Sequence, residues 1–170
     1  NYLCNKLYHM RNFIFLSVFL LSFAGFSQKT LPNINLKTFE GDKVNVADLT
    51  SNDKIAILSL WATWCVPCIK ELDAINELYD EWKTQVDFEV YAISVDDSRS
   101  INRAKALVNG KGWEHNILLD TNHNLKRSLG ASAIPVTIIV RNNKILYQHT
   151  GYRNGDEYEL FEKLKTLSKE

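Results

Sequence analysis

Cysteine is scarce in this sequence, and several common binding motifs are missing. The chain has three cysteines, and neither a second CxxC nor a closely spaced histidine pair accompanies Cys65 and Cys68. A structural zinc site needs four ligands, so this sparse set disfavours zinc. No GxGxxG stretch is present, so nothing indicates a nicotinamide or flavin dinucleotide. The sequence therefore predicts neither a metal nor a cofactor.

An excess of charge is also missing. Twenty Lys and Arg balance twenty Asp and Glu, which gives a formal net charge of zero. Nucleic acids and anionic membrane surfaces attract basic proteins, so the balance gives no support to either as a partner. A hydrophobic content of 45% in 170 residues is typical of one soluble globular domain.

No apolar run reaches the roughly 20 residues that a membrane span needs. The longest, residues 13–24, follows Arg11 and precedes small residues at 25 and 27. This basic, apolar and small-residue order predicts a secretory signal peptide over residues 1–27. The expected product is an exported, periplasmic domain of residues 28–170.

Two points about this leader stay open. If the segment is retained instead of cleaved, it anchors the protein and brings it into contact with the membrane. Residues 1–9 precede the first methionine and are either part of the leader or translation upstream of the true start. Cys4 lies in this stretch and is expected to be lost with the leader. No cysteine lies near the cleavage position, so a lipid anchor is not expected.

Strands and helices alternate along the rest of the chain. The apolar run at 55–60, IAILSL, is typical of a central strand buried on both faces. Alternation of this kind predicts an α/β fold with a largely parallel sheet, helices on both faces and an antiparallel edge at the Asn142-Asn143 turn. The expected strands are 34–37, 43–46, 55–60, 88–95, 117–120, 135–140 and 145–149, and the expected helices run from the CxxC to 82 and over 100–108 (closed by Asn109-Gly110), 125–129 and 156–167.

The stretch WATWCVPC, residues 61–68, lies where the buried strand turns into the first helix. A helix N-terminus has unpaired N–H groups and a partial positive charge, which lower the pKa of the Cys65 thiol. Pro67 suits the first helical turn, and Cys68 lies one turn further in. We therefore expect Cys65 to be the nucleophile that attacks a partner disulfide and Cys68 to resolve the mixed disulfide. A purely structural disulfide is the alternative, although closing so small a loop stabilises little.

In this context the sequence resembles the thioredoxin fold. The stretch Ala133-Ile134-Pro135-Val136-Thr137, about 70 residues after the CxxC, is similar to the thioredoxin cis-proline loop. An X–Pro bond is usually trans. The resemblance implies a cis bond at Ile134–Pro135 beside the dithiol, with the Ile134 backbone pairing to an extended substrate segment.

Two further features narrow the resemblance to the exported TlpA/ResA-like thioredoxins, relatives of the AhpC/TSA group. They are the hairpin at 35–46 followed by Ala47-Asp48-Leu49, and an insert from about 98 to 119. The resemblance covers about residues 31–168. It implies a thioredoxin-like central mixed sheet with helices on both faces, an N-terminal β-hairpin and a helix–strand insert.

The same resemblance assigns a role to Glu71. In that family a glutamate three residues after the second cysteine lies near the dithiol and tunes it. Cytosolic thioredoxins have a buried aspartate six residues before the first cysteine, where this chain has Ser59. Glu71 is therefore the expected proton-handling group, and the alternative is a solvated carboxylate on the helix surface.

Two tryptophans flank the site. Trp61 is expected in the core, and Trp64 is expected to offer an apolar contact surface to a partner protein, although simple packing explains either residue equally well.

The spacer between the cysteines bears on the direction of electron flow. Val66-Pro67 carries no charge that would stabilise a thiolate, so we expect a potential nearer the roughly −270 mV of thioredoxin than the roughly −120 mV of a strong oxidant. The expected function is reduction of disulfides in other exported proteins, for example apocytochrome c before haem attachment. A membrane thiol-electron donor would supply the electrons.

Two rival functions remain. Peroxidases of the related peroxiredoxin group need P-x-x-x-T-x-x-C, and this chain has Leu58 and Ala62 at the proline and threonine positions. A non-catalytic binding module with an inert disulfide is the other.

Overall fold

The computed structural model describes residues 29–51 and 53–169. The predicted signal peptide and Cys4 lie outside these residues. None of the helices within the described ranges combines the length and the apolar character needed to cross a membrane.

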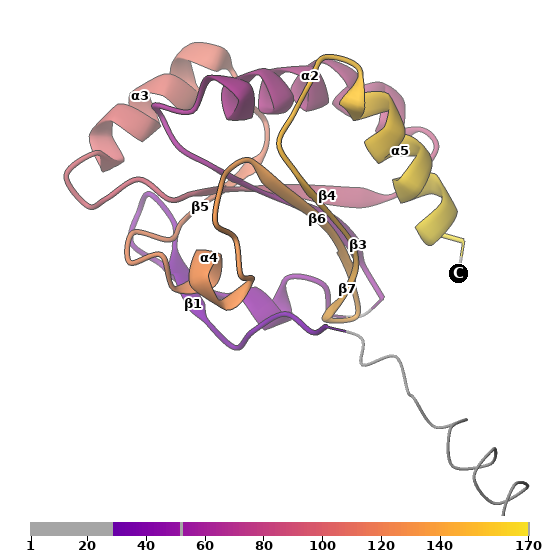
Figure 1. Ribbon diagram of the computed structural model, residues 1–170, viewed down its shortest axis with the longest axis horizontal. Coiled ribbons are helices and arrows are strands. Elements are labelled where there is room, and N and C mark those ends of the chain that lie inside the picture. Colours follow the sequence, from indigo (N-terminus) through magenta and orange to yellow (C-terminus); the bar gives the residue numbers. More distant parts are fainter. Residues whose placement is uncertain (1–28, 52, 170) are drawn as a thin grey trace, which may run out of the picture.

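The described chain forms one mixed sheet in the order β2-β1-β5-β4-β3-β6-β7 (Figure 1). The strands are β1 (Asn35–Lys37), β2 (Lys43–Asn45), β3 (Ile55–Trp61), β4 (Phe88–Ser94), β5 (Asn116–Leu119), β6 (Val136–Arg141) and β7 (Lys144–Thr150). The helices are α2 (Val66–Lys83), α3 (Ile101–Lys111), α4 (Asn124–Ser128) and α5 (Asp156–Leu167), with a 3₁₀ turn η2 at Val46–Asp48.

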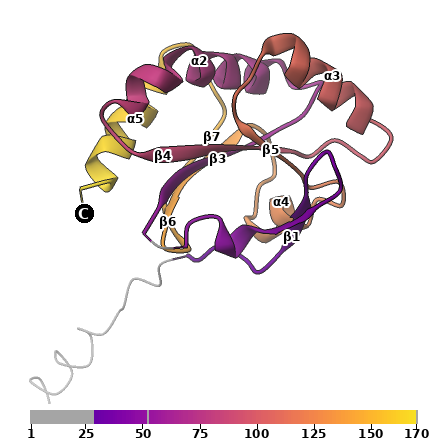
Figure 2. The ribbon, with the colours of Figure 1, turned by 180° about the vertical axis from the view of Figure 1, so that it is seen from behind.

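Helices cover both faces of the sheet. Both views place α2, α3 and α5 on one face and α4 on the other (Figures 1 and 2). Trp82 of α2 and Phe161 of α5 stack with their ring centroids 4.6 Å apart. Every residue of the central strand β3 is buried. The predicted α/β class, with a mixed sheet, an N-terminal hairpin and a helix–strand insert, is confirmed.

The antiparallel edge predicted at the Asn142-Asn143 turn is confirmed, but the expectation that the rest of the sheet is largely parallel is wrong. β3 and β5 run parallel to β4, but β6 and β7 are antiparallel to their neighbours, and so are β1 and β2. Both β3 and β6 are rich in apolar residues, because every residue of β3 and every residue of β6 except Arg141 is buried. An apolar run reports burial and carries no information on strand direction.

Helix α3 ends later than predicted. Gly110 lies inside the helix, and Gly112 adopts the left-handed conformation (φ 64°) that ends it. The N–H groups of Gly112 and Trp113 then donate to Asn109 and Val108 carbonyls, as in a Schellman cap. This cap directs Trp113 into the core, edge-on to Trp61 at 5.1 Å. The insert is therefore anchored to the body of the domain.

Candidate active site

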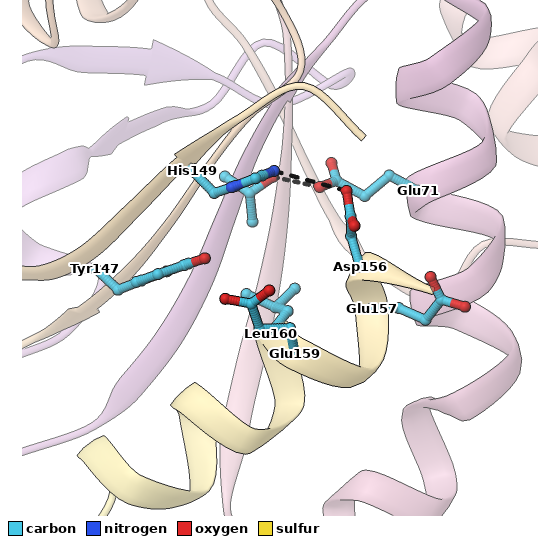
Figure 3. A pocket seen from close by; sticks show the side chains of 8 residues that line it. Glu71, Tyr147, His149, Asp156, Glu157, Glu159 and Leu160 are labelled. Atoms are coloured by element: carbon cyan, nitrogen blue, oxygen red, sulfur yellow. Dashed lines mark hydrogen bonds and ion pairs between the residues drawn. The ribbon is translucent and has the colours of Figure 1, made fainter. Parts of the chain in front are cut away.

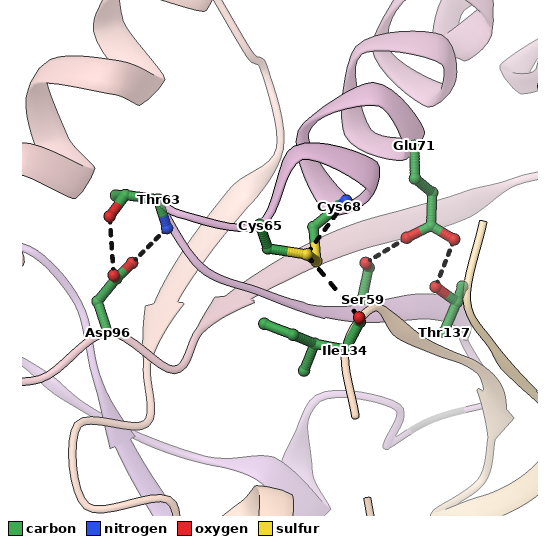
Figure 4. Close-up of a disulfide and its surroundings, with 8 residues drawn as sticks. All are labelled: Ser59, Thr63, Cys65, Cys68, Glu71, Asp96, Ile134 and Thr137. Atoms are coloured by element: carbon green, nitrogen blue, oxygen red, sulfur yellow. Dashed lines mark hydrogen bonds between the residues drawn. A yellow bond between two sulfur atoms is a disulfide. The ribbon is translucent and has the colours of Figure 1, made fainter. Parts of the chain in front are cut away.

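Cys65 and Cys68 form a disulfide at the N-terminus of α2 (Figure 4). Their Cα atoms are 5.3 Å apart. Cys68 is fully buried, whereas Cys65 keeps 5% of its surface exposed. Because a partner disulfide must reach the attacking sulfur, the exposure favours Cys65 for that step.

The local backbone explains why Cys65 suits the role of a nucleophile. Cys65 is the N-cap of α2, and its Sγ accepts a hydrogen bond from the Cys68 N–H at 3.3 Å. Pro67 lies in the first turn, where its missing N–H removes no helical hydrogen bond. The N–H groups of this turn and the helix dipole therefore face the sulfur and would stabilise a thiolate in the reduced protein.

Asp96 holds the loop that leads to Cys65. Its buried carboxylate accepts hydrogen bonds from the Thr63 N–H, the Thr63 hydroxyl and the Ser94 hydroxyl, each at 2.9 Å. Sequence reasoning missed this residue. The signal was present, because Thr63 and Asp96 each come just after one of two neighbouring parallel strands, β3 and β4, whose ends meet at one edge of the sheet.

The loop before β6 forms the other side of the site. The Ile134–Pro135 peptide bond is cis, and the Ile134 carbonyl oxygen lies 3.8 Å from Cys65 Sγ. An open groove of about 520 Å³ starts here. It is lined by Pro67, Ile134, Pro135 and residues of the segment from His149 to Asp156.

Glu71 is buried one turn after Cys68. Its side chain is 3% exposed, so the alternative of a solvated surface carboxylate is wrong. The hydroxyls of Ser59 and Thr137 donate hydrogen bonds to its two oxygens, at 2.8 and 2.7 Å. Burial raises the pKa of Glu71 to about 7, even though these two hydrogen bonds lower it. A carboxyl with this pKa can gain or lose a proton near neutral pH.

Glu71 also lines a small cavity (Figure 3). His149 of β7 and Asp156 of α5 line this cavity with it, and the His149 Nε2 lies 3.7 Å from the Asp156 Oδ2. Neither residue was singled out from the sequence as part of the site, because only the packing of α5 against β7 brings them to Glu71.

The two tryptophans have different environments. Trp61 is fully buried. Trp64 is 65% exposed and Val66 is 62% exposed, so two apolar side chains next to the cysteines face solvent. Within residues 29–51 and 53–169, no three His, Cys, Asp or Glu side chains gather in a way that could hold a metal ion.

Comparison with known proteins places this geometry in a family. The AhpC/TSA family model matches residues 28–149. The thiol-disulfide oxidoreductase ResA of Bacillus anthracis is 28% identical over 132 residues, which cover 77% of this chain and 73% of the relative.

Solved structures agree with this. The solution structure of an uncharacterized thioredoxin-like protein from Porphyromonas gingivalis is 41% identical, covers 82% of this chain and 92% of its own, and has a TM-score of 0.72. A chain from Chlorobium tepidum described as a thiol:disulfide interchange protein, DsbE, is 25% identical over 83% of this chain and 96% of its own, with the same TM-score of 0.72. This chain therefore belongs to the AhpC/TSA family, as a thioredoxin-fold, ResA/TlpA-like thiol-disulfide oxidoreductase whose CxxC pair is Cys65 and Cys68.

Proposed function

We propose that this oxidoreductase is exported and reduces disulfides in other exported proteins. The observation that carries the reducing direction is the charge around the dithiol. The spacer residues Val66 and Pro67 are neutral, and the ionisable side chain buried one turn after Cys68 is an acid, Glu71. An ionised carboxylate disfavours a second negative charge nearby, so it destabilises the Cys68 thiolate. A dithiol whose thiolate is destabilised gives up its electrons more readily.

The proposed reaction uses three side chains, those of Cys65, Cys68 and Glu71. The Cys65 thiolate attacks a substrate disulfide, which forms a mixed disulfide and releases one substrate sulfur as a thiolate that takes up a proton from solvent. Cys68 then attacks the Cys65 sulfur, and the second substrate sulfur leaves as a thiolate that takes up a proton. Glu71 accepts the proton of the Cys68 thiol, because a carboxyl with a pKa of about 7 is partly ionised at neutral pH. The product is the Cys65–Cys68 disulfide seen here.

A substrate segment has a surface to lie on beside Cys65. The exposed Trp64 and Val66 offer apolar contact next to the sulfur. The Ile134 backbone would pair with an extended substrate segment along the groove. These features suit an unfolded or extended polypeptide better than a small molecule.

Export is supported by the leader pattern of residues 10–27, and the expected compartment is the periplasm. The spent disulfide needs an electron source there, and the sequence has no dinucleotide-binding motif, so a membrane thiol protein is the proposed donor. Apocytochrome c before haem attachment is one candidate substrate, since its haem-binding cysteines must be reduced.

The proposal is tested by reduction of insulin with dithiothreitol as the electron source. The parent protein should accelerate insulin precipitation, and Cys65→Ser should abolish the acceleration. Equal rates for the two proteins would refute the reductase function. Thiol loss in hydrogen peroxide separates the peroxidase alternative, because a reductase consumes peroxide no faster than free cysteine does.

A further inference from the structure

His149 lies beside Thr137, whose hydroxyl donates a hydrogen bond to Glu71. In the antiparallel pair of β6 and β7, Thr137 stands opposite His149. Residues opposite each other in such a pair project from the same face of the sheet, with Cβ atoms about 5 Å apart. Because the Thr137 hydroxyl donates to Glu71, the imidazole of His149 borders the same carboxylate (Figure 3).

Asp156 completes the cluster from the first residue of α5. Its Oδ2 accepts a hydrogen bond from the Arg153 N–H at 2.8 Å and lies 3.7 Å from the His149 Nε2. A protonated imidazole at this position would form an ion pair with the carboxylate. The side chains of His149 and Asp156 are 41% and 35% exposed, whereas Glu71 is 3% exposed. The cluster therefore spans from the buried acid to solvent.

The space between these groups is the size of one water molecule. The cavity that Glu71, Thr137, His149 and Asp156 line measures about 10 Å³, roughly what a single water needs. His149 and Asp156 also line the larger groove beside Ile134 and Pro135. His149 and Asp156 therefore lie between the cavity at Glu71 and the groove in which substrate would lie.

A proton that Glu71 takes from the Cys68 thiol needs a path to solvent. Cys68 is fully buried, and each oxygen of Glu71 accepts one hydrogen bond, from the hydroxyl of Ser59 or of Thr137. The other titratable or charged groups that line this cavity or the adjoining groove are Tyr147, Tyr152, Arg153, Asp156, Glu157 and Glu159. An imidazole can act as a proton shuttle, because its two ring nitrogens can accept and release a proton.

We propose that His149 and Asp156 form a proton relay that connects Glu71 to solvent during thiol-disulfide exchange. The relay deepens the proposed function and rests on Glu71 as the proton acceptor. The S–H bond of Cys68 breaks as Glu71 gains the proton. The O–H bond of Glu71 then breaks, and the proton passes through one water to His149, whose imidazolium is stabilised by Asp156. Release to solvent restores neutral His149 and ionised Glu71, and no electrons move in the relay.

The experiment follows the step that needs Cys68. One equivalent of dithionitrobenzoate is mixed with the reduced protein between pH 5 and 9. Cys65 displaces the first thionitrobenzoate, and Cys68 displaces the second. We expect His149→Gln and Asp156→Asn to slow the second release by roughly 10-fold near neutral pH, since a positioned acid or base is worth 10-fold or more. The first release should keep its rate.

The control is Glu162→Gln, which removes one negative charge from α5, as Asp156→Asn does, but at a residue paired with Lys165. It should leave both releases unchanged. Added imidazole should restore the second release in His149→Gln, whereas a structural defect would not respond to the buffer. In a Glu71→Gln background, His149→Gln should add no further slowing, because the relay acts through Glu71.

The outcomes separate the two claims. If Glu71→Gln slows the second release while His149→Gln and Asp156→Asn do not, the relay is wrong and the role of Glu71 stands. If Glu71→Gln itself leaves that release unchanged, both claims fail. Slowing that imidazole does not reverse, or that persists in the Glu71→Gln background, also overturns the relay.

Discussion

The hydroxyl of Ser59 donates a 2.8 Å hydrogen bond to the carboxylate of Glu71, at the position where cytosolic thioredoxins have an aspartate. In this chain the carboxyl of the pair therefore lies on the helix α2, and the strand β3 contributes the hydroxyl. The hydroxyl cannot accept the proton of Cys68 at neutral pH, whereas the carboxyl can, because burial raises the pKa of Glu71 to about 7. The predictions below depend on this arrangement.

The buried acid should make stability depend on pH. The pKa of Glu71 is raised from 4.5 to about 7 on folding, so the folded state holds a proton that the unfolded state has lost. Stability from this group is complete below about pH 4.5 and is lost as pH rises through 7. By pH 8 we expect the oxidised parent to have lost about 3 kcal/mol relative to Glu71→Gln.

Urea unfolding at a series of pH values checks this. Glu77→Gln on the exposed face of α2 is the matched control and should follow the parent curve. Parallel curves for the parent and Glu71→Gln would contradict the raised pKa.

Removing the hydroxyl of Thr137 should raise the pKa of Glu71 further, because its hydrogen bond favours the ionised carboxylate. Thr137→Val is expected to move the pH dependence of Cys68 alkylation to higher pH, and Thr137→Ser should restore the parent profile. The carboxyl chemical shift of Glu71, followed by NMR across the titration, measures the change directly. A downward shift in Thr137→Val would be incompatible with this role of the hydroxyl.

Asp96 should hold the loop before Cys65. In Asp96→Asn the amide nitrogen cannot accept the hydrogen bonds that one carboxylate oxygen now accepts, and a buried group left unsatisfied costs about 1–3 kcal/mol. We expect this loss of unfolding free energy together with slower reaction of Cys65 with dithionitrobenzoate. The neighbouring Asp97→Asn removes an exposed ion pair with Arg99 but keeps a side-chain oxygen that can accept from the Arg99 and Ser100 N–H groups, so it should change neither quantity. An Asp96→Asn protein with parent-like thiol rates would show that the loop holds its shape without the clamp.

Trp64 should matter for protein substrates and not for folding. Because it is 65% exposed, Trp64→Ala should change the unfolding free energy by no more than about 0.5 kcal/mol. The KM for insulin should rise several-fold, while the rate with dithionitrobenzoate stays the same. Tyr158→Ala, which removes a similarly exposed aromatic from α5, is the control. Equal losses with both substrates would assign Trp64 to the shape of the site instead.

Local patterns predicted some features of this molecule well and others poorly. The positions of Cys65 and Cys68 at a strand–helix junction follow from the apolar run before them and the amphipathic spacing after them. The predicted direction of β6 and the predicted end of α3 were wrong. Strand direction, and the choice between Gly110 and Gly112 as the helix end, depend on contacts distant in the sequence. His149 and Asp156 show the same limit, since each is an ordinary surface residue until β7 and α5 meet over Glu71.

The central claim is that a neutral spacer and a buried acid make Cys65 and Cys68 a reducing couple. Equilibration of the protein in defined dithiothreitol buffers, with the dithiol fraction counted after alkylation, measures its midpoint potential. We predict a value near the roughly −270 mV of thioredoxin. A midpoint near the roughly −120 mV of a strong periplasmic oxidant would contradict the account, because the couple would then accept electrons from exported proteins instead of supplying them.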